Sequence, residues 1–202
     1  FDDNDLSQHG DALNSFLLTC WLTFLHRVTS LSEITLSYLR DGREFDELQT
    51  TFGLLAEPVS LSVSCDSNTA FSELQSRARE AIDVVDGNEG VRIAYEFEDQ
   101  PGRISAGALD FTLIDLYCCS YPFKIKLRCI RKVDQLRYEL HYDAASFASE
   151  TVSKFAETFK EIVDNALRHP QKPIGELNVI SPNERLHLLH TLAGTRSEYP
   201  RN

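Results

Sequence analysis

Apolar side chains recur every three or four residues in three long stretches, and this spacing predicts helices. In the first stretch Asp5 or Ser7 is placed to cap the helix, and Asn68 or Thr69 is placed to cap the second. Pro170 and the proline at 173 should end the third. The predicted helices are residues 5–29, 70–85 and 149–168, with a short one at 182–191.

Alternating apolar and polar residues predict strands between the helices. The clearest is PVSLSVSCDS, residues 58–67, in which apolar residues alternate with serine. Residues 123–132 and 135–143 are separated only by a two-residue connection, so they should form a hairpin. The other predicted strands are residues 33–42, 91–99 and 109–118. This order of elements predicts an α/β fold, a two-layer sandwich in which helices cover a mixed β-sheet.

Composition describes an ordinary globular protein and narrows its partners. The 202 residues are 42% hydrophobic and 25% charged, and 20 Lys and Arg against 31 Asp and Glu give a formal net charge of −11. Nucleic acids and anionic membranes are bound by clustered basic residues. We therefore expect neither a nucleic acid nor a membrane as a partner.

The five cysteines favour a reducing compartment. Cys20, Cys65, Cys118, Cys119 and Cys129 form no C-x-x-C pair, and their odd number leaves one unpaired in any disulfide scheme. We therefore expect a cytoplasmic protein. The most apolar run, FLLTCWLTFL, is too short to span a bilayer and predicts a buried helix. The sequence has no methionine and neither end resembles a natural terminus, so we expect it to be part of a longer chain.

The stretch LRYELHYDAASF offers the first chemical candidate. Alternation along its strand places Glu139, His141 and Asp143 on one face. His141 is thus either a catalytic base with an acidic partner or one polar residue of an exposed sheet face. The second interpretation is favoured, because this pattern also suits a solvated face.

Other candidate chemistry is weaker still. His187 and His190 lie three residues apart with Glu184 one turn earlier, which is not the spacing of the zinc protease motif. Cys118 and Cys119 have no nearby histidine, and the carboxylates of Asp110 and Asp115 have no distinctive spacing. No G-x-S-x-G, P-loop or G-x-G-x-x-G motif occurs. We therefore expect no catalytic, cofactor-binding or metal-binding residue in this chain.

The second half carries a series of landmarks in a fixed order. It begins with Pro-Phe, continues through a hairpin ending in Tyr-Asp and a Phe four residues later, and closes with Ser-x-x-Glu-Arg and Tyr-Pro. This order resembles the C-terminal end of the condensation domains of nonribosomal peptide synthetases. The landmarks are Pro122-Phe123, Tyr142-Asp143, Phe147, Thr151-Val152, Pro170, Ile174, Leu177, Ser181, Glu184-Arg185 and Tyr199-Pro200.

The first half resembles the same family with departures. Gly53 matches the glycine of a family strand, but Glu57 and Pro58 stand where Asn-Thr is expected, and Ser62 stands where Arg is expected. Residues 41–43, Asp-Gly-Arg, match the end of the preceding strand. After the second helix, DGNEG replaces the family's longer segment containing His-Gln-Asp.

The resemblance implies half of a chloramphenicol-acetyltransferase-like fold. Residues 1–178 would be the C-terminal lobe, and residues 179–202 the linker to a downstream adenylation domain. The family's catalytic His-His-x-x-x-Asp-Gly motif is absent from this sequence. The resemblance also implies that the hairpin containing His141 is part of the structural framework and not of the active site. The residues implied at the interface with the adenylation domain are Glu184, Arg185, Leu188, Leu189, Tyr199 and Pro200.

Three functional hypotheses follow from the resemblance. The leading one is a truncated, inactive condensation-like domain that acts as a structural platform for the adenylation domain. The alternative is half of an active condensation domain whose catalytic lobe lies outside this chain. The third is a binding module for a carrier protein. The chain itself is expected to hold no cofactor, because phosphopantetheine would be carried by a neighbouring carrier domain, which is therefore a further candidate partner. The acidic charge of both molecules disfavours this third hypothesis.

Overall fold

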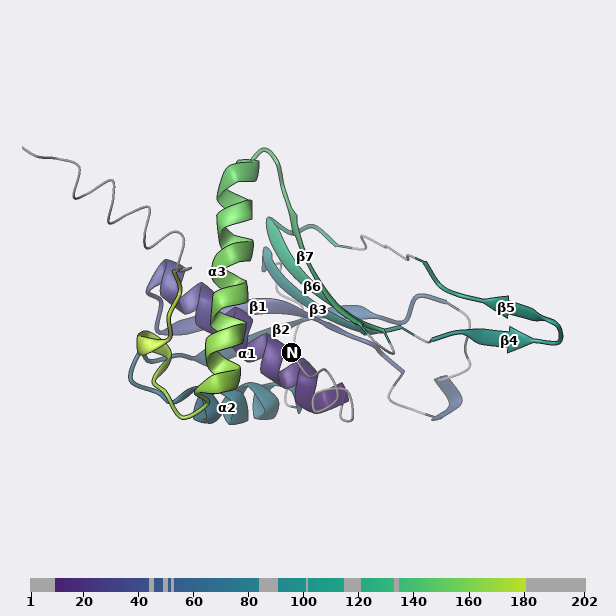
Figure 1. The fold of residues 1–202 in the computed structure, drawn as a ribbon, viewed down its shortest axis with the longest axis horizontal. Helices are drawn as coiled ribbons and strands as arrows, with labels where there is room; N and C mark the ends of the chain where they lie inside the picture. Colours follow the sequence, from purple (N-terminus) through teal and green to yellow (C-terminus); the bar gives the residue numbers. More distant parts are fainter. Residues whose placement is uncertain are drawn as a thin grey trace, which may run out of the picture.

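The computed structural model describes residues 10–43, 46–48, 51, 53–83, 91–100, 102–114, 121–132 and 135–180. Within these residues, five strands form one mixed sheet in the order β2-β1-β3-β6-β7 (Figure 1). The β1–β2 and β6–β7 pairs are antiparallel, and the β1–β3 and β3–β6 pairs are parallel. The strands are β1 (Glu33–Arg40), β2 (Glu57–Ser64), β3 (Ile93–Asp99), β6 (Ile125–Lys132) and β7 (Gln135–Tyr142).

Three helices pack on one face of this sheet. They are α1 (Gly10–Thr29), α2 (Phe71–Asp83) and α3 (Ser149–Arg168). Tyr95, Leu127 and Leu140 are register partners across three strands, and all pack into the core beneath the helices. The predicted fold class, a two-layer sandwich with helices covering a mixed sheet, is confirmed.

Helix α1 lies at the centre of the core. Its first buried residue is Leu13 and its last is His26, and most side chains between them are buried. Trp21 stacks on Phe24 at 5.0 Å and meets Phe159 of α3 edge-on at 6.1 Å. A helix that is apolar on all sides belongs in an interior. The expectation of a buried helix in this run is therefore confirmed.

The first main-chain N–H groups of α2 donate to main-chain carbonyl oxygens from another part of the chain. The N–H groups of Phe71 and Ser72 donate to the carbonyl oxygens of Lys172 and Pro170 at 3.0 and 2.8 Å. The sequence-based expectation of a side-chain cap from Asn68 or Thr69 was therefore wrong. The local sequence could not show this cap, because the carbonyl groups that provide it lie about a hundred residues further along the chain.

The segment after α3 is fastened to the end of α1. This segment contains a short 3₁₀ helix, η2 (Ile174–Glu176). Elsewhere in the chain, another 3₁₀ helix, η1 (Asp46–Leu48), lies between β1 and β2. The guanidinium of Arg27 donates to the carbonyl oxygens of Ile174, Gly175 and Leu177 at 2.7–3.1 Å. One α1 side chain thus holds the last described turn of the chain.

A small hairpin, here called the arm, projects away from the sheet (Figure 1). It consists of β4 (Ile104–Ala106) and β5 (Leu109–Phe111), which pair only with each other. Of the predicted strand at 109–118, residues 109–111 form β5, which pairs with β4 and not with the main sheet, and residues 112–114 are not strand. Residues 115–118 lie outside the described residues. Gly107, with φ +65°, forms the tight turn that returns the chain before a long strand can form.

The remaining predicted elements agree with the structure to within a few residues at their ends. Helix α3 has the predicted bounds, and the β6–β7 hairpin is in register from Lys132 and Gln135 outward. The caps at Asp5 and Ser7 and the helix at 182–191 lie outside the described residues. Among the helices described, none combines the length and apolarity needed to cross a bilayer.

Candidate functional site

The face of the sheet opposite the helices carries a row of charges. Glu96 of β3, Arg128 of β6 and Glu139 of β7 are register partners on three adjacent strands, so their side chains lie side by side. Lys126 and His141 form the neighbouring row. We call these five residues the charged face.

Two basic residues of the charged face are buried. The side chains of Lys126 and Arg128 are 1% and 2% exposed. Lys126 Nζ lies 2.6 Å from Glu96 Oε2, and Arg128 lies 2.5 Å from Glu98 and 3.2 Å from Glu139. Buried cations persist only when they are paired in this way.

The pKa values on the charged face reflect this pairing. Burial disfavours the Arg128 cation, but the carboxylates of Glu98, Glu96 and Glu139 outweigh it and raise its pKa. Burial also disfavours the charged form of Glu139 and so tends to raise its pKa. His141, Arg137 and Arg128 outweigh this effect, and the pKa of Glu139 is lowered. Both groups are thus held in their charged forms.

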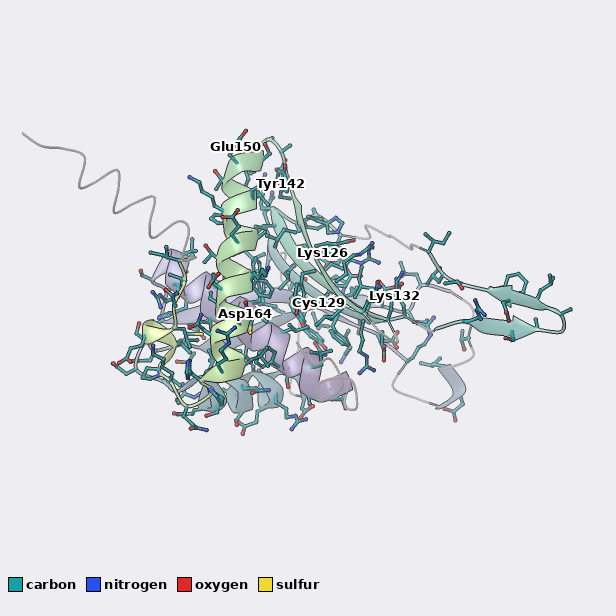
Figure 2. The ribbon with its side chains drawn as sticks, in the orientation of Figure 1. Lys126, Cys129, Lys132, Tyr142, Glu150 and Asp164 are labelled. Carbon is teal, nitrogen blue, oxygen red and sulfur yellow. The ribbon has the colours of Figure 1, made fainter. Side chains whose placement is uncertain are left out.

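Aromatic rings cover the lysine of the charged face. The Lys126 ammonium lies 5.0 Å from the centre of the Phe123 ring and 5.8 Å from that of Tyr121. Both rings belong to the chain that enters β6, which Figure 2 shows with Lys126 labelled near its start. The lysine is thereby shielded on one side by rings and neutralised on the other by Glu96.

His141 and Asp143 do not form a catalytic pair. The Nε2 atom of His141 lies 2.8 Å from Glu139, within the charged face. Asp143 instead accepts bonds from Lys124, from the N–H of Ala145 at 2.9 Å and from the Ser146 hydroxyl at 2.9 Å. These bonds lower the pKa of Asp143 to about 2, with the Lys124 bond as the largest cause. The favoured interpretation, a polar sheet face, agrees with this arrangement.

A polar pocket opens where β1 and β3 separate. These parallel strands are paired only at Ser37–Ala94 and Tyr38–Tyr95, beyond which they diverge. The pocket at this point has a volume of about 530 Å³. Its walls come from the first turn of α1, the carboxyl ends of β1 and β3, residues 54 and 56, and Arg128. Crevices at the carboxyl ends of parallel strands are frequent ligand sites.

Two tyrosines and an asparagine organise the inner wall of this pocket. The side-chain amide of Asn14 donates to the Tyr38 hydroxyl at 2.8 Å, and the Tyr95 hydroxyl donates to Asn14 Oδ1 at 3.0 Å. Burial raises the pKa of both tyrosines. The phenols are therefore neutral hydrogen-bonding groups and not nucleophiles at ordinary pH.

The outer wall of the pocket is acidic. Asp11, Asp41, Glu96, Glu98 and Asp99 contribute carboxylates. Most of these are paired with cations, as Asp99 is with Arg131 at 2.9 Å. Neutral phenols and paired carboxylates can bind and orient a polar group, but they provide no activated nucleophile.

The departures in the first half of the chain lie on the strand beside β1 and do not line this pocket. Glu57, Pro58 and Ser62 all lie on β2, the edge strand beyond β1. Arg40 of β1 binds Glu57, and Ser62 shares a hydrogen bond of 2.7 Å with Thr35. Glu57 and Ser62 are thus each bonded to a side chain of the neighbouring strand β1.

Several sequence candidates lie outside the described residues. They are the six interface residues Glu184, Arg185, Leu188, Leu189, Tyr199 and Pro200, the histidines His187 and His190, the cysteines Cys118 and Cys119, and Asp115. Asp110 lies on the arm, where it binds Arg103 and Ser105. Cys20, Cys65 and Cys129 are free and buried, and burial raises the pKa of Cys65 to about 11. No cluster suited to a metal ion occurs among the residues that the structure describes.

Sequence reasoning placed Glu139 and His141 on one face but did not find that Glu96, Lys126 and Arg128 share it. The signal was nevertheless present, because FKIKLRC places Lys126 and Arg128 at alternate positions and YEFED places Glu96 and Glu98 likewise. The pattern becomes informative only when the two strands are known to be neighbours in register.

Comparison with known proteins gives a consistent likeness. Residues 105–189 match the family model of the condensation domain. Bacitracin synthase 1 from Bacillus licheniformis is 22% identical over 97% of this chain and 4% of its own length. Tyrocidine synthase 3 from Brevibacillus parabrevis is 23% identical over 96% of this chain and 3% of its own length.

Solved structures show the same fold. The first condensation domain of the calcium-dependent antibiotic synthetase has a TM-score of 0.66 at 14% identity, covering 89% of this chain and 43% of that one. The starter condensation domain of rhizomide synthetase has a TM-score of 0.68 at 12% identity, covering 87% and 47%. The chain therefore has the α/β fold of part of a condensation domain and spans less than half of these solved chains. The family match and the relatives support a relationship to the condensation domains of peptide synthetases.

Proposed function

We propose that this chain is a catalytically inactive, condensation-like lobe of a nonribosomal peptide synthetase, and that it acts as a structural platform for an adjacent adenylation domain. The observation that carries the proposal is the state of the charged face, where Lys126, Arg128 and His141 are each engaged by a glutamate. A general base must be available to a substrate proton. Lys126 and Arg128 are only 1% and 2% exposed, so we infer that this face stabilises the fold and does not act on a substrate.

The sequence supports the same conclusion. No two histidines are adjacent in the 202 residues, so the family's His-His-x-x-x-Asp-Gly motif is not supplied by this chain. We infer that the chain holds no cofactor of its own and that phosphopantetheine belongs to a neighbouring carrier domain. The free, buried thiols agree with a reducing cytoplasm.

A second candidate function is favoured by the arm. Leu109 and Phe111, on the projecting arm, are 64% and 52% exposed, and Ile114, three residues after β5, is 83% exposed. Exposed apolar groups gathered on a projecting element are suited to cover a partner surface. The chain would then be the framework half of an active, amide-forming condensation domain whose catalytic lobe lies outside it.

The platform proposal is tested at the predicted interface with the adenylation domain. In the protein that contains both domains, Leu188→Asp and Leu189→Asp should loosen the interface, because each places a charge at an apolar contact. Limited proteolysis between the domains should become at least several-fold faster. Leu31→Asp, at a 57% exposed position of the lobe, is the control and should not change the rate. Equal cleavage rates in all four proteins would contradict the platform.

A further inference from the structure

An apolar groove lies on the far side of the lobe from the charged face. It has a volume of about 640 Å³ and lies between α3, the first half of α1 and strand β7. Phe16 of α1, Phe159 and Val163 of α3, and Leu136 and Leu140 of β7 line it. None of these residues belongs to the polar pocket or to the charged face.

The groove is elongated. Its lining follows β7 from Gln135 to Leu140 and α3 from Ala156 to Leu167. At the rise per residue of a strand and of a helix, each wall is about 17 Å long. Two walls of equal length, one a strand and one a helix, suit an extended occupant of about five or six residues.

Strand β7 is an edge of the sheet described. The Arg131 carbonyl accepts from Gln100 on the β3 side, and the Lys124 carbonyl accepts from Asp143 on the β7 side. In β6, therefore, the main-chain N–H and C=O groups of even-numbered residues point toward β7. Their register partners are the odd-numbered residues of β7, whose main-chain groups point back toward β6. Consequently Leu136 and Leu140 direct their main-chain N–H and C=O groups toward the outer edge, while their side chains line the groove.

We propose that this groove binds an extended peptide segment of a partner protein, which adds a strand to β7 and inserts alternate apolar side chains between β7 and α3. Main-chain bonding at a strand edge together with a side-chain groove beside it is an established mode of peptide recognition. An acyl chain would use the apolar walls but not the strand edge. Lys160 and Asp164, with opposite charges one turn apart on α3, also give no preference for an anionic headgroup.

The first experiment selects peptides without assuming their sequence. A displayed library of random octapeptides is bound to the 202-residue chain after depletion on its Ala156→Trp variant, whose indole fills the groove. Ala156 is exposed, so this variant should keep its fold, which circular dichroism checks. Selected peptides should show apolar residues at alternate positions. Their affinity should fall at least tenfold on Ala156→Trp but not on Lys154→Trp, which lies on the opposite side of α3.

The second experiment tests the strand itself. Selected peptides are resynthesised with N-methyl groups at alternate residues, which removes the donors that face β7. One of the two methylated registers should bind at least tenfold more weakly. Failure to enrich any peptide, or equal affinity of both methylated forms, overturns the proposal. Binding of decanoate that is lost in Ala156→Trp, without peptide enrichment, would assign the groove to acyl chains. A dimer of the chain that Ala156→Trp abolishes would assign it to a second copy.

Discussion

At the residue scale, the buried arginine of the charged face lies next to three glutamates. Arg128 lies between Glu96, Glu98 and Glu139, and its side chain is 2% exposed. Removing one partner of a buried ion pair leaves the others uncompensated in a low-dielectric site. The lobe should therefore depend strongly on this single cation.

Arg128→Met should lower the free energy of unfolding by about 3–5 kcal/mol, measured by urea denaturation. The control is Arg103→Met in the ion pair with Asp110, whose side chains are 69% and 49% exposed. Exposed pairs contribute about 0–1 kcal/mol, so the control should change little. Equal losses of unfolding free energy in the two variants would show that the ion pairs of Arg128 contribute no more than an exposed pair.

Asp143 should make stability depend on acid pH. Its pKa is lowered from the ordinary 3.8 to about 2 by Lys124, Ala145 and Ser146. Because the folded chain binds this proton less readily than the unfolded chain, the stabilisation is complete above pH 3.8 and is lost as pH falls toward 2. The difference in urea midpoint between the wild type and Asp143→Asn should therefore shrink from pH 5.5 to pH 2. A difference that stays constant over this range would refute the assignment.

Gly42 is required for a reason beyond its dihedral angle. Its φ is +69°, and a Cβ atom there would lie 2.2 Å from the Leu55 carbonyl oxygen. Gly107 has a similar φ of +65°, but a Cβ atom there would meet nothing within 4 Å. Gly107→Ala should cost about 1 kcal/mol from backbone strain alone. Gly42→Ala should cost at least about 2 kcal/mol by the same measurement. Equal costs would mean that the loop at Leu55 yields freely.

At the element scale, Arg27 couples the first helix to the end of the described chain. A single guanidinium atom, Nη1, donates to all three carbonyl oxygens. The lysine side chain is one bond shorter, so its ammonium should not reach all three of them. Arg27→Lys should lower stability by about 1–3 kcal/mol. It should also speed amide exchange at Ile174 and Gly175. Arg79→Lys, an exposed substitution on α2, is the control. Exchange rates that do not change would mean that other contacts hold this segment.

The elements show which features a sequence can predict. The bounds of α3 followed from its apolar stripe, and the β6–β7 hairpin followed from alternation and a two-residue connection. Only part of the arm was predicted. Leu109–Phe111 fell within an expected strand, but Ile104–Ala106 did not, because a three-residue strand is too short to show alternation. The main-chain cap of α2 was also not predicted, because the carbonyls of Pro170 and Lys172 reach it only in the folded chain.

The candidate site was predictable only in part. Alternation placed His141 and Glu139 together on one face, as the structure has them. The pairing of Arg128 with three glutamates required the strand order β3-β6-β7, which a single sequence does not specify. The pocket beside Tyr38 required, in addition, the point at which β1 and β3 diverge.

At the scale of the whole molecule, the main sheet has two contrasting faces. Helices seal one face of the sheet, while the other bears the charged face, with the arm projecting from the sheet beyond it (Figure 1). Leu109→Asp and Phe111→Asp should leave the melting temperature of the lobe unchanged, since both side chains are exposed. If the arm covers a companion lobe, the same variants should weaken that association at least tenfold in a pull-down titration. Unchanged association would remove the support that the arm gives to an active condensation domain.

The proposed platform role is tested most directly by deleting residues 1–180 from the protein that contains this chain and the adenylation domain, and measuring adenylation, soluble yield and amide formation together. Adenylation is followed by ATP–pyrophosphate exchange, and the intact protein is the reference. We expect yield or adenylation to fall at least several-fold and the intact protein to form no amide bond with this part of the chain. Unchanged adenylation, together with the loss of an amide-forming step, would contradict this expectation and show that the lobe takes part in catalysis.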